Sequence, residues 1–256
     1  MNDQEGVILE QELALLDDQY KRWRKIARET IESLGEESVA YWVDAYNTCI
    51  DLNSAINRQY PRETLVHHLL FYRFLELYKE LSWLWFLFLV GNYPMLAREL
   101  RFTWEAFSQA YVVDVGFPTV DIERKIKRLN KKQYRGWPVI LKALEIMPSS
   151  IGEKQVWHGM YDTLSLIAHP TRTEIDLKLL RAKGAPLVTD AFDEKTASGL
   201  FIAAKMLFDE VWTIAFFQYP DIAQPLSEVS GFVQHLKDFC PFAYLHLRVL
   251  VGKQEL

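Results

Sequence analysis

The stretch LSWLWFLFLVGNYPM, residues 81–95, decides the fold of this chain. Its first ten residues are the most apolar run in the sequence, but a membrane span needs about 20. We therefore expect a helix that is buried on all sides in the middle of a helical bundle. Gly91-Asn92 predicts a tight turn, and Pro94 is typical of the first turn of a new helix. Together these signals predict a long antiparallel helical hairpin.

Apolar residues recur at spacings of three and four outside this stretch, without the sustained alternation that is typical of strands. Glycine and proline mark where helices should begin and end. The expected helices cover 3–34, 36–59, 61–90, 94–114, 120–133 (capped by Thr119), a short helix after Trp137-Pro138, 151–168, 193–218, 226–239 and 241–251. Residues 172–190 are expected to be mainly loop. The predicted fold is an all-α, up-and-down helical bundle with a long central helical hairpin.

Composition excludes several classes of protein. A net charge of -5 excludes a globally basic nucleic-acid binder. Cys49 and Cys240 are the two cysteines and form no Cys-x-x-Cys pair, which excludes zinc-ribbon and thioredoxin-like sites. The acidic, polar start of the chain does not resemble a signal peptide. We expect a single cytoplasmic domain over residues 1–256, without a membrane partner. The helical pair at 1–59 could belong to the bundle or lie at its periphery.

The stretch YDTLSLIAHPT, residues 161–171, combines a helix end with acid–base side chains. Pro170 disfavours the α conformation of the residue before it, so His169 is expected to end the helix. Helical geometry places His158, Asp162, Ser165 and His169 on the face opposite the apolar residues. This polar stripe could support acid–base chemistry, or it could be an ordinary solvated face.

Arg101 and Glu105 are four residues apart on the second helix of the hairpin, so they can pair along it. The simpler interpretation is a surface ion pair. The alternative is an arginine that glutamate holds in place and that binds an anion, because the planar guanidinium suits phosphate.

The two motifs together, ARELRFTWEAF (97–107) and YDTLSLIAHPT, resemble the HEPN-like helical families over residues 60–220. The resemblance concerns an uncharacterised branch in which an Arg-x-x-x-Glu step and a Leu-Ser-x-x-x-His-Pro-Thr step recur. It implies a bundle that often dimerises, with metal-independent ribonucleases and inactive binding modules among its members. Active members carry an arginine before the histidine, whereas Asp162, Thr163 or Leu164 stands at that place here. The ribonuclease motif is therefore incomplete.

Two basic clusters are candidates for contact with the RNA backbone. One consists of Arg124, Lys125, Lys127, Arg128, Lys131, Lys132 and Arg135, and the other is KRWRKIAR at 21–28, with Trp23 embedded in it. A solvated helix face would have the same composition. The Glu-x-x-His spacing of a bundle metal site is absent. His67, His68, Tyr72 and Glu76 share a predicted helix and could bind a metal, but adjacent histidines point about 100° apart, so only one would face a given site. Neither a metal nor a cofactor is expected.

Two hypotheses follow. In the first, a homodimeric HEPN-like protein binds or cleaves RNA. Arg101 holds a phosphate, Glu105 orients Arg101, and His169 acts as general acid or base, with Ser165 and Tyr161 as hydrogen-bonding support. In the second, the same residues form a polar network in a non-catalytic interaction module.

Overall fold

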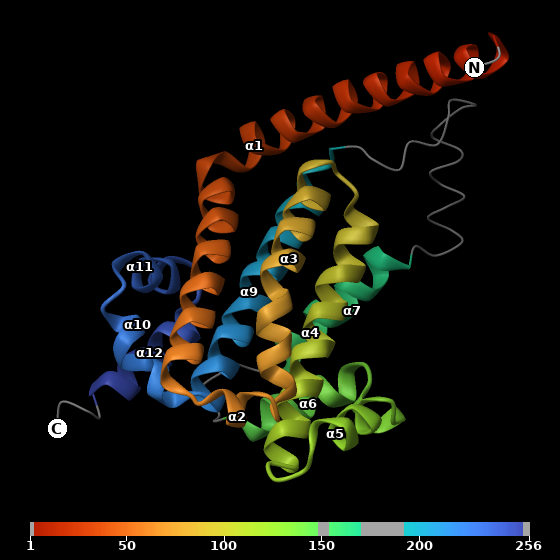
Figure 1. Ribbon diagram of the computed structural model, residues 1–256. Coiled ribbons are helices and arrows are strands. Elements are labelled where there is room, and N and C mark those ends of the chain that lie inside the picture. Colours follow the sequence, from red (N-terminus) through yellow and green to blue (C-terminus); the bar gives the residue numbers. More distant parts are fainter. Residues whose placement is uncertain (1–2, 148–153, 170–191, 253–256) are drawn as a thin grey trace.

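The structure, a computed structural model, describes residues 3–147, 154–169 and 192–252, with side chains from residue 15 onward. Every regular element within these ranges is a helix, and the helices pack as a bundle (Figure 1), which confirms the predicted fold class. No described helix is both long and apolar enough to cross a membrane. The segment 172–190, predicted to be mainly loop, lies outside the described residues.

The predicted hairpin is formed by α3 (Leu69–Leu89) and α4 (Tyr93–Gly116), which run antiparallel at the centre of the bundle (Figure 1). Gly91 has a φ of 70°, a conformation that favours glycine. The side chain of Asn92 accepts a hydrogen bond from the backbone N–H of Met95 at 3.3 Å and so caps α4. These local signals explain why the turn was visible in the sequence.

The apolar run in α3 is not buried on all sides, so that expectation was wrong. Leu81 and Leu84 are buried, but Trp83 is 44% exposed and Phe86 is 39% exposed. Neighbouring helices cover only the inner side of α3. Its outer side leaves large aromatic rings in contact with solvent.

The helix predicted over 61–90 is interrupted, and α2 (Arg62–Leu65) is separate from α3. Asp114, near the end of α4, accepts backbone hydrogen bonds from Leu69 at 3.1 Å and Leu70 at 2.9 Å. Lys125 Nζ bonds Asp114 Oδ1 at 2.9 Å and the carbonyl of His67 at 2.8 Å. The Lys125 and Asp114 side chains are both fully buried. A buried ion pair therefore fixes the start of α3 from a distant part of the chain.

The other helices follow the predicted order with altered bounds. They are α1 (Asp3–Gln59), α5 (Ile122–Leu129), the 3-10 helix η1 (Lys132–Tyr134), α6 (Trp137–Ile146), α7 (Lys154–Ala168), α9 (Glu194–Gln218), the 3-10 helix η2 (Pro220–Ile222), α10 (Ala223–Ser227), α11 (Ser230–Phe239) and α12 (Pro241–Gly252). The N-cap of α5 is Asp121, not Thr119, because the Asp121 carboxylate accepts from the Arg124 N–H at 3.0 Å. The helix predicted over 226–239 is divided between α10 and α11.

α1 bends at Gly35, whose φ of 73° and ψ of 178° are not helical, at the predicted boundary between two helices. The second half of α1 belongs to the core, since Tyr41, Cys49 and Ile56 are fully buried. The first half leaves the body of the bundle (Figure 1). Its inner end still packs on the bundle, since Ile26 and Thr30 are buried, whereas Leu16 and Tyr20 further out are exposed.

Buried side chains join α4 to α9 in the middle of the bundle. Trp104 Nε1 donates to Glu210 Oε2 at 2.7 Å, and both residues are buried. Burial raises the pKa of Glu210 to about 8, and the hydrogen bond from Trp104 partly offsets this effect. With this face of α4 fixed against α9, Arg101 and Glu105 lie at the partly exposed edge of α4 that meets α7.

Candidate functional site between α4 and α7

Arg101 connects α4 to α7 through contacts of its guanidinium. Its Nε donates to Glu105 Oε1 at 3.0 Å, one helical turn along α4. Its NH1 donates to Ser165 Oγ at 3.3 Å, on α7. The guanidinium also lies 5.3 Å from the centre of the Tyr161 ring, within the range of a cation–π contact. These contacts fix the plane of the guanidinium.

Glu105 is a junction for three elements of the bundle. Its Oε1 accepts the Tyr161 hydroxyl of α7 at 2.9 Å, and its Oε2 accepts the backbone N–H of Gly136, just before α6, at 3.0 Å. Gly136 has a φ of 63°, and an added Cβ would come within 3.3 Å of the Tyr161 hydroxyl. Glycine is therefore favoured at this position for its backbone conformation and for the close approach.

The pKa of Tyr161 is raised to about 12 by burial and by its hydrogen bond to the Glu105 carboxylate. Both effects favour the neutral phenol, because the phenolate would be desolvated beside a negative charge. Tyr161 therefore remains a hydrogen-bond donor to Glu105 across the physiological pH range.

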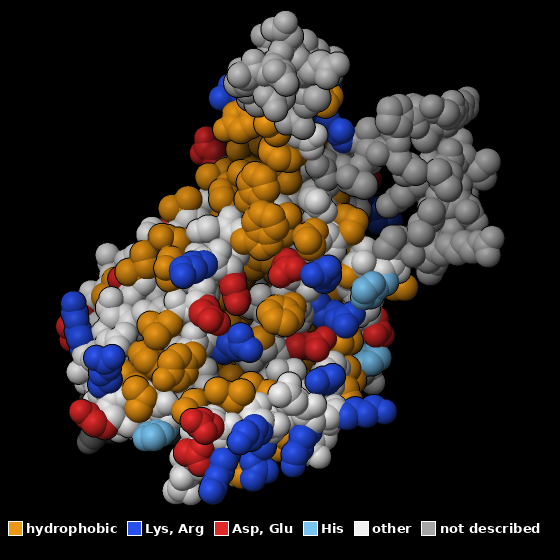
Figure 2. Space-filling view, turned by 45° about the vertical axis from the view of Figure 1, so that its right-hand side comes forward, with side chains coloured by type: hydrophobic (Ala, Val, Ile, Leu, Met, Phe, Trp, Pro, Cys, Tyr) orange, Lys and Arg blue, Asp and Glu red, His pale blue; other side chains and the backbone are white. Residues whose placement is uncertain are grey.

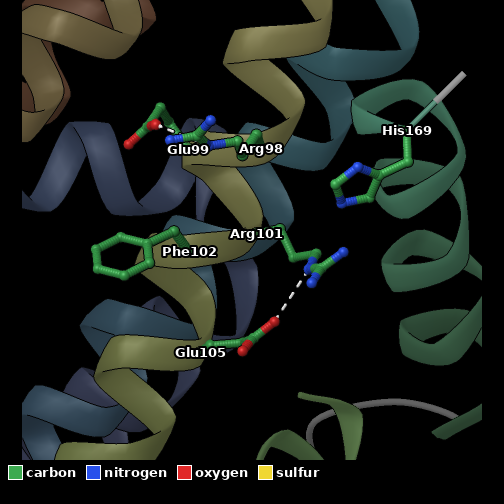
Figure 3. A pocket seen from close by; sticks show the side chains of 6 residues that line it. All are labelled: Arg98, Glu99, Arg101, Phe102, Glu105 and His169. Carbon is green, nitrogen blue, oxygen red and sulfur yellow. Dashed lines mark hydrogen bonds and ion pairs between the residues drawn. The ribbon is translucent and has the colours of Figure 1, made fainter. Parts of the chain in front are cut away.

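His169 closes the site from the end of α7. Its backbone N–H still bonds the carbonyl of Ser165 at 3.0 Å, and its side chain is exposed. In Figure 3 the imidazole extends from α7 toward Arg101 on α4. Both line a cavity of about 370 Å³, whose other lining residues are Arg98, Glu99, Phe102 and Glu105.

The cavity contains groups suited to holding an anion. Arg98 pairs with Glu99 at 3.6 Å but is 63% exposed, so it can turn toward a ligand. Arg101 and Glu105 are 28% and 17% exposed, which is more enclosed than the surface pair considered from the sequence. Because Glu105 already accepts from three donors, the face of Arg101 toward the cavity is the part suited to an incoming oxyanion.

The polar stripe predicted on α7 is divided between two surroundings. Ser165 and His169 lie at the Arg101 site. His158 instead pairs with Asp162 at 3.2 Å and contacts the Trp137 ring, with ring centres 4.7 Å apart. The structure thus brings together Arg101, Glu105, Tyr161, Ser165 and His169.

The basic segment of α5 and η1 requires one correction. Lys125 was expected to contact RNA, but its side chain is fully buried against Asp114 and cannot reach a phosphate at the surface. The other six residues keep exposed or half-exposed side chains. Of these, Arg128 lies 3.7 Å above the Phe117 ring, and Arg135 donates to the carbonyl of Asn130. Figure 2 shows Lys and Arg side chains gathered at the lower end of the molecule.

Sequence reasoning missed Gly136, Arg98 and Phe102 as parts of the site. Gly136 immediately follows the basic segment, so the backbone that leaves this segment also anchors Glu105. Nothing in the sequence relates Gly136 to Glu105, which is 31 residues earlier. Arg98 could have been found, because it lies three residues before Arg101 on the same helix face, and Phe102 lies four residues after Arg98.

Among the described residues, no group of three or more His, Cys, Asp or Glu side chains could hold a metal ion. His68, one of the residues considered for a metal, instead places its Nδ1 3.2 Å from the Tyr219 hydroxyl. Comparisons with family models, curated proteins and solved structures found no match for this chain.

Proposed function

We propose that this chain is a homodimeric, HEPN-like RNA-binding protein that holds an RNA phosphate in the cavity between Arg101 and His169. One observation carries the proposal. Glu105 and Ser165 hold the Arg101 guanidinium in one plane, and His169 lies at the same cavity. An arginine fixed in this way loses less side-chain freedom when it binds a phosphate.

The basic segment supports RNA as the source of that phosphate. Lys127, Lys131 and Lys132 are exposed on the α5–η1 segment, and the chain passes directly from Arg135 to Gly136 at the site. A polyanion that follows these side chains can present one phosphate to the cavity. Exposed Phe102 at the cavity offers a ring on which a base of a single strand can stack.

His169 makes cleavage of the held phosphodiester possible without a metal. In that reaction His169 takes the proton of the ribose 2′-hydroxyl, and the 2′ oxygen attacks phosphorus. The bond to the 5′ oxygen breaks, and that oxygen takes a proton from water. Arg101 stabilises the charge that develops on the phosphoryl oxygens. The products are a 2′,3′-cyclic phosphate and a 5′-hydroxyl.

A second function, that of a non-catalytic interaction module, is favoured by the contacts of Glu105. Its carboxylate joins α4, α7 and the start of α6, which is what a purely structural network would do. In that case Arg101 serves only to hold α7 on α4, and His169 only ends α7. The two functions differ in what happens when His169 alone is removed.

The test is cleavage of a mixed single-stranded RNA pool in excess chelator. Wild type is compared with His169→Ala and with His158→Ala, a matched control that removes an exposed histidine of the same helix. We expect wild type and His158→Ala to release 2′,3′-cyclic phosphate ends and His169→Ala to release none.

If the proteins bind RNA but none of the three cleaves it, the chain is an RNA-binding module without ribonuclease activity. Absence of both binding and cleavage would support the structural network instead. Thermal unfolding of each variant must match wild type, so that loss of activity is not loss of fold.

A further inference from the structure

The first half of α1, residues 3–34, is a helical arm that extends away from the bundle above the end of α3 (Figure 1). At 1.5 Å per residue it is about 48 Å long. In proteins, most of the stability of a helix comes from the packing of an apolar face against a neighbour. Beyond its inner end, the arm therefore needs a partner for its apolar face.

The arm carries an apolar stripe with the spacing of a coiled coil. Leu16, Tyr20 and Trp23 follow one another at steps of four and three, and the sequence continues the pattern backward to Leu13 and Leu9. At the inner end, Trp23 packs edge-on against Phe86 of α3, with ring centres 5.7 Å apart. Further out, Leu16 is 63% exposed and Tyr20 is 57% exposed. Within the described residues, the stripe thus leaves its support on α3 and continues uncovered.

The end of α3 extends this apolar surface. Trp83 stacks on Phe86 with ring centres 5.5 Å apart, and both rings remain partly exposed. In Figure 2, hydrophobic side chains form a strip that runs from the upper body of the molecule onto the arm. A second helix laid along the arm would cover both parts of this strip.

Between residues 3 and 28 the charges of the arm are segregated along its length, and Glu29 and Glu32 follow at its inner end. Within the arm, Lys21 pairs with Asp17 at 2.7 Å and Lys25 with Glu29 at 3.7 Å, and both pairs are exposed. Residues 3–18 contain Asp3, Glu5, Glu10, Glu12, Asp17 and Asp18 and no basic residue. Residues 21–28 contain Lys21, Arg22, Arg24, Lys25 and Arg28 and no acidic residue. Two such arms laid antiparallel bring the acidic tip of each to the basic base of the other. Laid parallel, they bring like charges together at both ends.

We propose that two copies of this chain pair through their arms, antiparallel, with the apolar stripes in contact and each tip beside Trp83 and Phe86 of the other copy. The stripe supplies the buried apolar surface, and the segregated charges select the antiparallel direction. The inference gives an interface to the dimer proposed above, but it does not depend on RNA binding. It also gives the 21–28 cluster a protein partner in place of RNA.

The test uses two full-length charge-reversed variants, examined by sedimentation equilibrium. The base variant carries Arg24→Glu, Lys25→Glu and Arg28→Glu. The tip variant carries Glu10→Lys, Glu12→Lys and Asp17→Lys. In a dimer of either variant alone, the tip of one arm and the base of the other carry charges of the same sign at both ends of the antiparallel pair. We expect the dissociation constant of this dimer to rise at least ~10-fold, since three charges change at each end of the antiparallel pair.

An equimolar mixture of the two variants should recover dimers with an affinity close to wild type, because tip and base are again opposite in sign. The control, Lys127→Glu with Lys131→Glu and Lys132→Glu, changes net charge by the same amount as the base variant and should leave the dimer intact. A monomeric wild type at all concentrations would overturn the proposal. A dimer that neither variant weakens would also overturn it, because the two copies would then pair through another interface. So would a base variant that loses RNA affinity but keeps its dimer.

Discussion

Replacement of Lys125 by methionine tests the buried ion pair that fixes the start of α3. Lys125 and Asp114 are fully buried 2.9 Å apart, and Asp114 also accepts from two backbone N–H groups. Methionine keeps the volume of lysine but leaves the Asp114 carboxylate without its cation and the His67 carbonyl without its donor. Removing one partner of a buried pair costs about 3–5 kcal/mol.

That cost is a large part of the total stability of a domain, which is roughly 5–15 kcal/mol. Urea unfolding followed by tryptophan fluorescence should therefore show a large loss for Lys125→Met. The double variant Lys125→Met with Asp114→Asn should lose less stability than Lys125→Met alone. No buried charge is left unpaired in it, and the asparagine side chain keeps one oxygen that can accept from a backbone N–H. Lys127→Met, at an exposed position of the same helix, should stay within about 0.5 kcal/mol of wild type.

A loss below about 1 kcal/mol for Lys125→Met would refute this reasoning, because that is the range of exposed ion pairs. A double variant no more stable than Lys125→Met would refute it as well. Either result would return Lys125 to the set of residues available to RNA.

Three further predictions follow. The folded-state pKa of Glu210, about 8, lies above its ordinary value of 4.5, so the folded state holds an extra proton and loses stability as pH rises from about 5 to 8. Glu210→Gln should make this decline less steep in urea unfolding at several pH values; an unchanged slope would contradict the assignment. Gly35→Ala should lower the free energy of unfolding by about 1–3 kcal/mol, because alanine is strained at a φ of 73°; no change in thermal unfolding would show that α1 straightens without cost. Charge reversal at Lys127, Lys131 and Lys132 should weaken RNA binding and reduce its salt dependence; titrations at two salt concentrations that match wild type would exclude this segment as an RNA contact.

Local signals allowed much of the fold to be predicted from the sequence. Gly91, Asn92 and Pro94 mark the hairpin, and Gly35 marks the bend in α1. The break between α2 and α3 was missed because its cause is not local. It depends on Asp114, which is 45 residues from the N–H of Leu69 that it caps.

The candidate site could be predicted in part. Helical spacing predicts the pairing of Arg101 with Glu105. Pro170 predicts that α7 ends beside His169. The contact of Gly136 with Glu105 depends on tertiary packing and could not be inferred. Lys125 was misassigned because it lies within a run of basic residues.

A periodicity argument would have separated Lys125 from its neighbours. It shares a face of α5 with Ile122 and Leu129, which pack against the core. A charged residue on the apolar face of a helix indicates a buried partner, and here that partner is Asp114. The identity of the partner still required the structure.

The most direct test of the central claim is the affinity of labelled single-stranded RNA for wild type, Arg101→Lys and Arg248→Lys, measured by fluorescence anisotropy in chelator. Arg101→Lys keeps the charge but loses the planar fork that Glu105 and Ser165 hold in place. Arg248→Lys makes the same change at an exposed position on α12. We predict that RNA affinity falls at least ~10-fold for Arg101→Lys, a loss of about 1.4 kcal/mol, and is unchanged for Arg248→Lys. Equal affinity of all three proteins for RNA, or no affinity in any of them, would contradict a phosphate site at Arg101.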